Sequence, residues 1–125
     1  MSLPNTHLRR GLLVDDDILY AHALQRALRR RGLDLTIARS VESAKHSAAN
    51  GHLDFALIDL RPGNESGLAL IESLRRSNPA MRIVLMSAYA SIATTAEAIR
   101  RGADDYLPKP TTADIIVRTL RNQDG

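Results

Sequence analysis

The chain has 125 residues, 44% of them hydrophobic and 25% charged, and a formal net charge of +3 at pH 7. These values are typical of a single globular domain, and the absence of cysteine excludes disulfides, thiolate metal sites and thiol catalysis. With no apolar run of about 20 residues and no secretory leader, we expect no membrane span and a cytoplasmic location. The basic residues are dispersed without interleaved aromatics, so we expect no direct nucleic-acid binding by this domain.

In chain order, short apolar runs alternate with longer helical patterns. Residues 12–14 predict a first strand and residues 18–31 a helix. Residues 33–38 predict a second strand, and Ser40 is the expected N-cap of a helix that ends near residue 50. The run 55–59 is apolar almost throughout and predicts a strand covered on both faces.

The second half of the chain continues the alternation after a loop over residues 61–65. The expected elements are a helix over residues 66–77, a strand over 82–87, a helix from Ser91 to Gly102, a strand over 106–107 and a last helix capped by Thr111 or Thr112. Five β/α units in one small domain predict an α/β fold, a doubly wound parallel sheet of five strands. Sites in such sheets lie at the carboxyl ends of the strands.

Polar residues stand at several of these strand ends. Asp15 and Asp16 follow the first strand, Asp59 ends the third, Ser87 ends the fourth and Lys109 follows the fifth. Adjacent carboxylates repel one another, so we expect a positive group to hold them. Carboxylates with a lysine predict a site that binds a hard cation and handles phosphate. Asp17 alone is interpreted as a helix cap.

Four segments at these positions carry a resemblance. They are residues 13–17 (LVDDD), 56–60 (ALIDL), 84–88 (VLMSA) and 102–110 (GADDYLPKP). Together and in this order they resemble the response-regulator receiver domain of two-component signalling, over residues 10–122. The resemblance implies a flavodoxin-like (βα)5 fold with strand order 2-1-3-4-5. Residues 91–94 and 106–110 are also similar to the redox-responding branch of global regulators, in which a DNA-binding output domain, absent from this chain, follows the receiver.

The resemblance implies a role for each acidic residue. Asp59 would accept a phosphoryl group from a phosphohistidine of a sensor histidine kinase, since a carboxylate can act as a nucleophile. Asp15, Asp16, Asp59 and the backbone carbonyl of Arg61 would hold Mg²⁺, with Mn²⁺ as an alternative. The domain would not be an enzyme, but a phospho-acceptor that assists its own phosphorylation and dephosphorylation.

The same resemblance implies how the signal leaves the site. Lys109 and Ser87 would contact the phosphoryl group, and Ser87 and Tyr106 would act as the switch. The switch would change the face around the fourth and fifth helices and control an output such as transcription. A homodimer formed on phosphorylation is one expected assembly. The Lys109–Pro110 bond is expected to be cis, as it usually is in the family.

Some positions depart from the family pattern. Pro62-Gly63 replaces a common Met-Pro pair, so the loop after Asp59 is expected to follow a different path. Arg61 and Tyr89 occupy the two variable positions that flank the site in the family. Our hypothesis is that their bulk limits the access of water and slows loss of the phosphoryl group.

Two other function classes are compatible with parts of the sequence. A magnesium-dependent phosphohydrolase of the haloacid-dehalogenase kind would use Asp15 as its nucleophile, although Asp104-Asp105 precedes Lys109 rather than following it. A receiver-like binding module could work without phosphate. The expected organisation is an N-terminal tail or tag over residues 1–9, the receiver over 10–122 and a short end at 123–125, where an output domain could begin.

Overall fold

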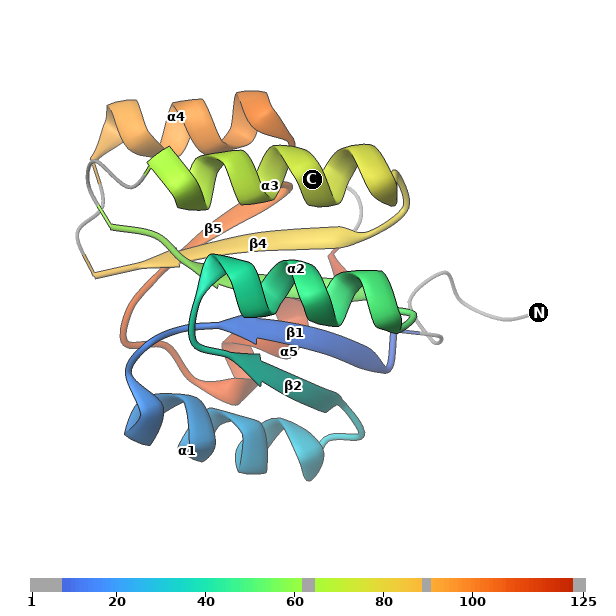
Figure 1. Ribbon diagram of the computed structural model, residues 1–125. Coiled ribbons are helices and arrows are strands. Elements are labelled where there is room, and N and C mark those ends of the chain that lie inside the picture. Colours follow the sequence, from blue (N-terminus) through green and yellow to red (C-terminus); the bar gives the residue numbers. More distant parts are fainter. Residues whose placement is uncertain (1–7, 62–64, 89–90, 123–125) are drawn as a thin grey trace.

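The computed structural model describes residues 8–61, 65–88 and 91–122, and within them the expected alternation of strands and helices is present (Figure 1). The strands are β1 (Arg10–Val14), β2 (Asp34–Ala38), β3 (Phe55–Asp59), β4 (Arg82–Ser87) and β5 (Asp105–Pro108). The helices are α1 (Ile18–Arg29), α2 (Val41–Asn50), α3 (Glu65–Ser77), α4 (Ile92–Arg101) and α5 (Ala113–Arg121).

The five strands form one parallel sheet in the order β2-β1-β3-β4-β5, which confirms the predicted topology. Successive side chains of a strand point to opposite faces, so neighbouring residues in a strand enter different cores. Leu12 of β1 belongs to the core beneath α2, α3 and α4, whereas Leu13 belongs to the core beneath α1 and α5. Figure 1 shows the helices on both faces of the sheet. This double coverage explains why the strands are apolar almost throughout.

Close packing of β1 on β3 depends on Gly11. A Cβ atom at this position would lie 2.1 Å from two ring atoms of Phe55, which is fully buried in the neighbouring strand. The aromatic ring therefore occupies the volume that any side chain at position 11 would need.

The end of α1 differs from the prediction by two residues. The helix stops at Arg29 because Gly32, with φ of +86°, turns the chain so that the Leu33 N–H donates to the Leu28 carbonyl at 3.0 Å. The predicted strand over 33–38 starts one residue later, at Asp34. These shifts leave Arg30 and Arg31 outside the helix but do not move the sheet register.

The starts of β1 and α3 also differ from the predictions. β1 begins at Arg10, two residues early, because the Asp54 carboxylate accepts the N–H groups of Arg9 and Arg10. Glu65 is the first residue of α3 rather than the last residue of a loop. The expected helix caps are present, and each accepts the N–H group three residues further on: Asp17, Ser40, Ser91 and Thr112.

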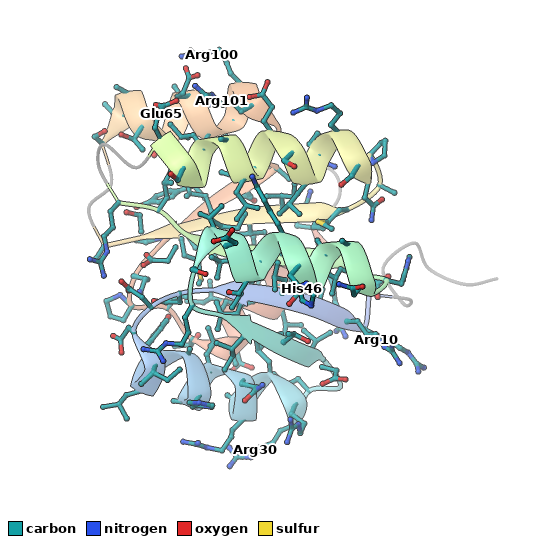
Figure 2. All side chains as sticks on the ribbon, in the orientation of Figure 1. Arg10, Arg30, His46, Glu65, Arg100 and Arg101 are labelled. Atoms are coloured by element: carbon teal, nitrogen blue, oxygen red, sulfur yellow. The ribbon has the colours of Figure 1, made fainter. Side chains whose placement is uncertain are left out.

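Ion pairs join α3 to α4. The Arg101 guanidinium lies 2.8 Å from Glu65 of α3 and 2.8 Å from Glu97 of its own helix. Figure 2 labels Arg101 on α4 beside Glu65 on α3. Hydrogen bonding by Glu97 raises the pKa of Arg101. The Arg101–Glu65 pair joins the end of α4 to the start of α3, and the pair with Glu97 orients the guanidinium within α4.

Candidate functional site

Three predicted site residues meet at the carboxyl edge of the sheet because parallel strands end there together. Asp15 directly follows β1, Asp59 is the last residue of β3, and Lys109 directly follows β5. The Lys109 N–H donates to the Ser87 carbonyl at 3.0 Å, which fixes the chain after β5 against the end of β4. The backbone thus carries residues 94 positions apart to one place.

Asp15 is the buried anchor of the site, with only 2% of its surface exposed. One carboxylate oxygen accepts a hydrogen bond from Lys109 Nζ at 2.9 Å, and the other accepts the Asp17 N–H at 2.9 Å. A buried charge needs such partners, since leaving it unpaired costs several kcal/mol. The first aspartate of the run therefore points inward, whereas Asp17 caps α1.

Asp59 lies beside this pair, and 8% of its side chain is exposed. Its carboxylate is 3.5 Å from Lys109 Nζ and 3.9 Å from Arg61 Nε. Burial raises the pKa of Asp59, and the negative charge of Asp15 raises it further, against the opposite influence of Lys109 and Arg61. Asp59 is thus a carboxylate held among both like and unlike charges.

Lys109 is enclosed by both acids and by an aromatic ring. Burial alone would lower its pKa, but the hydrogen bond and charge of Asp15, with those of Asp59, outweigh burial and raise it. The ammonium also lies 4.8 Å from the centre of the Tyr20 ring, within the range of a cation–π interaction. Lys109 is therefore held in its charged form.

Tyr20 was not predicted as a site residue. Its hydroxyl contacts the backbone of Thr111, accepting the N–H at 3.4 Å and donating to the carbonyl at 3.5 Å. The ring therefore ties α1 to the segment after Lys109. Tyr20 stands three residues after Asp17, and its N–H donates to the Asp17 carboxylate, so the first turn of α1 lies beside the acidic run. This spacing is the feature of the sequence that could have identified Tyr20 as a site residue.

Asp16 and Arg61 form the exposed side of the site. Arg61 Nη2 lies 3.0 Å from Asp16 Oδ1, and the two side chains are 56% and 59% exposed. The sequence suggested a role for the Arg61 carbonyl and for the bulk of its side chain, but not this contact with the acidic cluster.

The carboxylates suit a hard divalent cation. Asp15, Asp16 and Asp59 each offer one oxygen, and these oxygens all lie within 4.8 Å of one another. Oxygen ligands from carboxylates are those that Mg²⁺ and Ca²⁺ prefer. The residues present therefore fit the predicted metal.

Two pockets open on either side of Asp59 and Arg61. One, of about 130 Å³, lies toward the start of α2 and is lined by Val14, Asp15, Asp16, Arg39, Ser40, Val41, Asp59 and Arg61. The other, of about 280 Å³, lies toward Lys109 and is lined by Asp17, Tyr20, Asp59, Arg61, Ala88, Lys109 and Pro110. Asp59 thus borders both pockets.

The two predicted switch residues touch each other. Ser87 is buried at the end of β4, and the Tyr106 hydroxyl lies 3.5 Å from its carbonyl oxygen. The half-buried Tyr106 ring packs against the core beneath α2, α3 and α4. The Lys109–Pro110 peptide bond is cis, as predicted. Tyr89 and the loop residues 62–64 lie outside the described residues.

The amino-acid sequence of residues 12–121 matches the family model of the response regulator receiver domain. The chain belongs to this family. Among curated relatives, the photosynthetic apparatus regulatory protein RegA of Rhodobacter capsulatus is 41% identical over 90% of this receiver and 61% of its own length. The acid tolerance regulatory protein ActR of Sinorhizobium medicae is 40% identical over 91% of this receiver and 59% of its own length.

This receiver therefore spans about three fifths of the length of these regulators. The predicted resemblance to response regulators, and to the branch that includes RegA, is confirmed. A receiver is a signalling domain rather than a classical enzyme, and the phosphohydrolase interpretation is not favoured.

Solved structures agree with the family assignment. A response regulator of Burkholderia pseudomallei, with a phosphorylated aspartic acid, a calcium ion and citrate, is 38% identical and superposes with a TM-score of 0.84 over 90% of this receiver and 66% of that chain. A CheY-like receiver of Methanospirillum hungatei is 25% identical, also with a TM-score of 0.84, over 91% of each chain. The flavodoxin-like fold is confirmed. Among the described residues, no helix is long and apolar enough to cross a membrane.

Proposed function

We propose that Asp59 accepts a phosphoryl group from a phosphohistidine on a sensor histidine kinase. The observation that carries the proposal is the position of Asp59, beside Lys109 and within 4.8 Å of the oxygens offered by Asp15 and Asp16. An Asp59 oxygen would attack phosphorus as the P–N bond breaks, giving an acyl phosphate, and the released imidazole would take a proton. Catalysis is then positioning and charge neutralisation.

Lys109 and Ser87 would contact the transferred group. The Lys109 ammonium is already 3.5 Å from an Asp59 oxygen, so a phosphoryl group on that carboxylate comes within its reach. Ser87 ends the strand beside β3, and its hydroxyl would donate to a phosphoryl oxygen. Both interactions strengthen as negative charge arrives.

Asp15, Asp16, Asp59 and the Arg61 carbonyl would hold Mg²⁺, or Mn²⁺ in its place. The bound cation would supply positive charge that offsets the phosphoryl oxygens. Asp15 contributes a buried, preorganised oxygen because Lys109 and the Asp17 N–H hold its carboxylate in place.

The output would pass through Ser87 and Tyr106 to the face formed by α4, β5 and α5. The contact between the Tyr106 hydroxyl and the Ser87 carbonyl links this face to the site. Phosphorylation can shift the balance between two conformations only by its differential interaction with them. Residues 10–122 would act in the cytoplasm as the receiver of a regulator with a DNA-binding output domain, and a homodimer of the phosphorylated form is one route to transcription control.

The lifetime of the phosphoryl group would depend on Arg61 and Tyr89. The Arg61 side chain borders both pockets beside Asp59, where it would limit the approach of water. Arg61→Asn and Tyr89→Ala should each shorten the lifetime of the acyl phosphate in a hydrolysis assay. Unchanged lifetimes would refute this part of the proposal.

Intact mass spectrometry tests the proposal as a whole. Incubation with acetyl phosphate and Mg²⁺ should add one phosphoryl group to the wild-type protein. The adduct should be absent without Mg²⁺ and absent from Asp59→Asn. Failure of the wild-type protein to form an adduct would favour a phosphate-independent binding module.

A further inference from the structure

The Arg61 side chain makes a contact that neither water exclusion nor the predicted carbonyl ligand requires. Its guanidinium reaches across the carboxyl edge of the sheet, with Nη2 at 3.0 Å from Asp16 Oδ1 and Nε at 3.9 Å from Asp59 Oδ2. Asp16 and Asp59 are two of the three carboxylates that fit a divalent cation. The Arg61 guanidinium and a divalent cation would therefore bind the same two carboxylates.

The charges of the site make this competition direct. Three carboxylates face two side-chain cations, because Lys109 pairs with Asp15 and Asp59 while Arg61 pairs with Asp16 and Asp59. Without Arg61 the same cluster would keep two uncompensated negative charges, which match the charge of one divalent cation. With Arg61 in contact it keeps one.

Arg61 can also leave the site at little cost. Its side chain is 56% exposed, so the guanidinium can move into water without losing a buried environment. Lys109 differs, since only 13% of its side chain is exposed and it stays on the buried Asp15. Of these two basic side chains, Arg61 is thus the one that can leave its carboxylates when a metal ion binds them.

We infer that Arg61 is an internal counter-ion that competes with the divalent cation for Asp16 and Asp59 and so raises the cation concentration that the receiver needs. The inference rests on the proposed metal site and adds to it a residue that sets its affinity. The ligand that competes with Arg61 is a hard divalent cation with oxygen coordination, such as Mg²⁺, Mn²⁺ or Ca²⁺.

The test is a direct binding titration that does not involve phosphorylation. Free Mn²⁺ is measured by its electron paramagnetic resonance signal, and Mg²⁺ binding by calorimetry, for wild type, Arg61→Gln and Arg30→Gln. Arg61→Gln removes the guanidinium but retains the backbone carbonyl predicted to bind the metal. We expect it to bind both cations about 3- to 10-fold more tightly, a range within the factor that one or two close charges produce.

Arg30→Gln is the matched control. Arg30 is exposed at the end of α1, just before the chain enters β2, so it lies at the opposite edge of the sheet from the acidic residues. It changes the net charge by the same amount, so its effect on affinity should stay within about twofold. Equal tightening by both variants would overturn the inference, because distant charge rather than contact would be responsible.

The failures of the two proposals are distinguishable. If wild type and Arg61→Gln bind equally well while Asp16→Asn binds weakly, the metal site stands and the competition by Arg61 is refuted. If neither wild type nor Arg61→Gln binds Mn²⁺ in a way that depends on Asp16, the proposed metal site fails and the inference fails with it. Circular dichroism of each variant checks that the exposed substitutions leave the fold intact.

Discussion

At the scale of single residues, the site is a set of like charges held together by two cations. Asp59 is the residue on which the opposing influences meet, because burial and Asp15 raise its pKa while Lys109 and Arg61 lower it. An acid whose folded-state pKa lies above its ordinary value destabilises the fold once it is ionised. The position that would accept phosphate is thus one whose negative charge costs stability.

This cost predicts a pH dependence. The stability contributed by protonated Asp59 is present at low pH and is lost as the pH rises from the ordinary value of 3.8 through the higher pKa of the folded state. In chelator, Asp59→Asn should therefore melt at a higher temperature than wild type at pH 7, and the difference should shrink toward pH 3. A difference that grows as the pH falls would contradict the stated cause.

Lys109 gives a second prediction at this scale. Lys109→Ala should retain Mg²⁺ binding, because the ammonium is not a ligand. Phosphoryl transfer should fall about 10²- to 10³-fold, the usual effect of removing one charge-stabilising donor. Calorimetry and the rate of adduct formation measure the two quantities, with Asp16→Ala as the comparison. A loss of Mg²⁺ binding as large as that of Asp16→Ala would refute the division of roles.

At the scale of elements, the fit of β1 against β3 depends on one glycine. Gly11→Ala places a methyl group on the Phe55 ring and should lower the free energy of unfolding by about 1–3 kcal/mol in urea titrations. Gly51→Ala is the control, since its Cβ would meet only a backbone oxygen at 3.6 Å. Equal effects at both positions would show that lost chain flexibility, not overlap with the ring, decides the outcome.

The strands and helices were largely predictable because they depend on local sequence patterns. Apolar periodicity and caps such as Ser40 and Ser91 depend on nearby residues, so the sequence located every strand and helix to within about two residues. The end of α1 was misjudged because Arg30 and Arg31 are good helix formers, whereas Gly32 turns the chain so that the Leu33 N–H donates to the Leu28 carbonyl. The exact residue at which a helix ends depends on the backbone conformation of the following turn, which composition does not reveal.

Some contacts of the site were predictable from the sequence and others were not. Asp15, Asp59 and Lys109 could be brought together from the sequence, because strand ends of a parallel sheet share one edge. The contacts of Tyr20 with Lys109 and of Arg61 with Asp16 could not, since they depend on how side chains cross that edge. Residue type and spacing locate the ends of elements, but not the directions in which long side chains reach.

At the scale of the whole molecule, the opposite edge of the sheet is held together by Arg75 of α3. Its guanidinium donates to the carbonyls of Pro79, Met81 and Gly102 and pairs with Asp104 at 2.7 Å. Asp104 in turn accepts the N–H of Ile83 in β4. One side chain thus connects the segments before β4 and β5, far from the acidic site.

Arg75→Met should therefore destabilise the domain without changing its chemistry. We expect a loss of about 2–4 kcal/mol in unfolding free energy, because three carbonyls and a carboxylate lose their partner. Arg76→Met, at the exposed neighbouring position, should cost less than about 0.5 kcal/mol. The rate of phosphorylation per folded molecule should match wild type in both, and a large drop in Arg75→Met would mean that the two edges are coupled.

The central claim is that Asp59 is the residue that carries the phosphoryl group, and chemical mapping tests it most directly. After reaction with acetyl phosphate and Mg²⁺, borohydride reduces an acyl phosphate on aspartate to homoserine, which peptide mass spectrometry assigns to one position. We predict homoserine at position 59 alone. Homoserine at position 15 would indicate the chemistry of a phosphohydrolase nucleophile, and its absence from every aspartate would contradict a phosphoryl-accepting receiver.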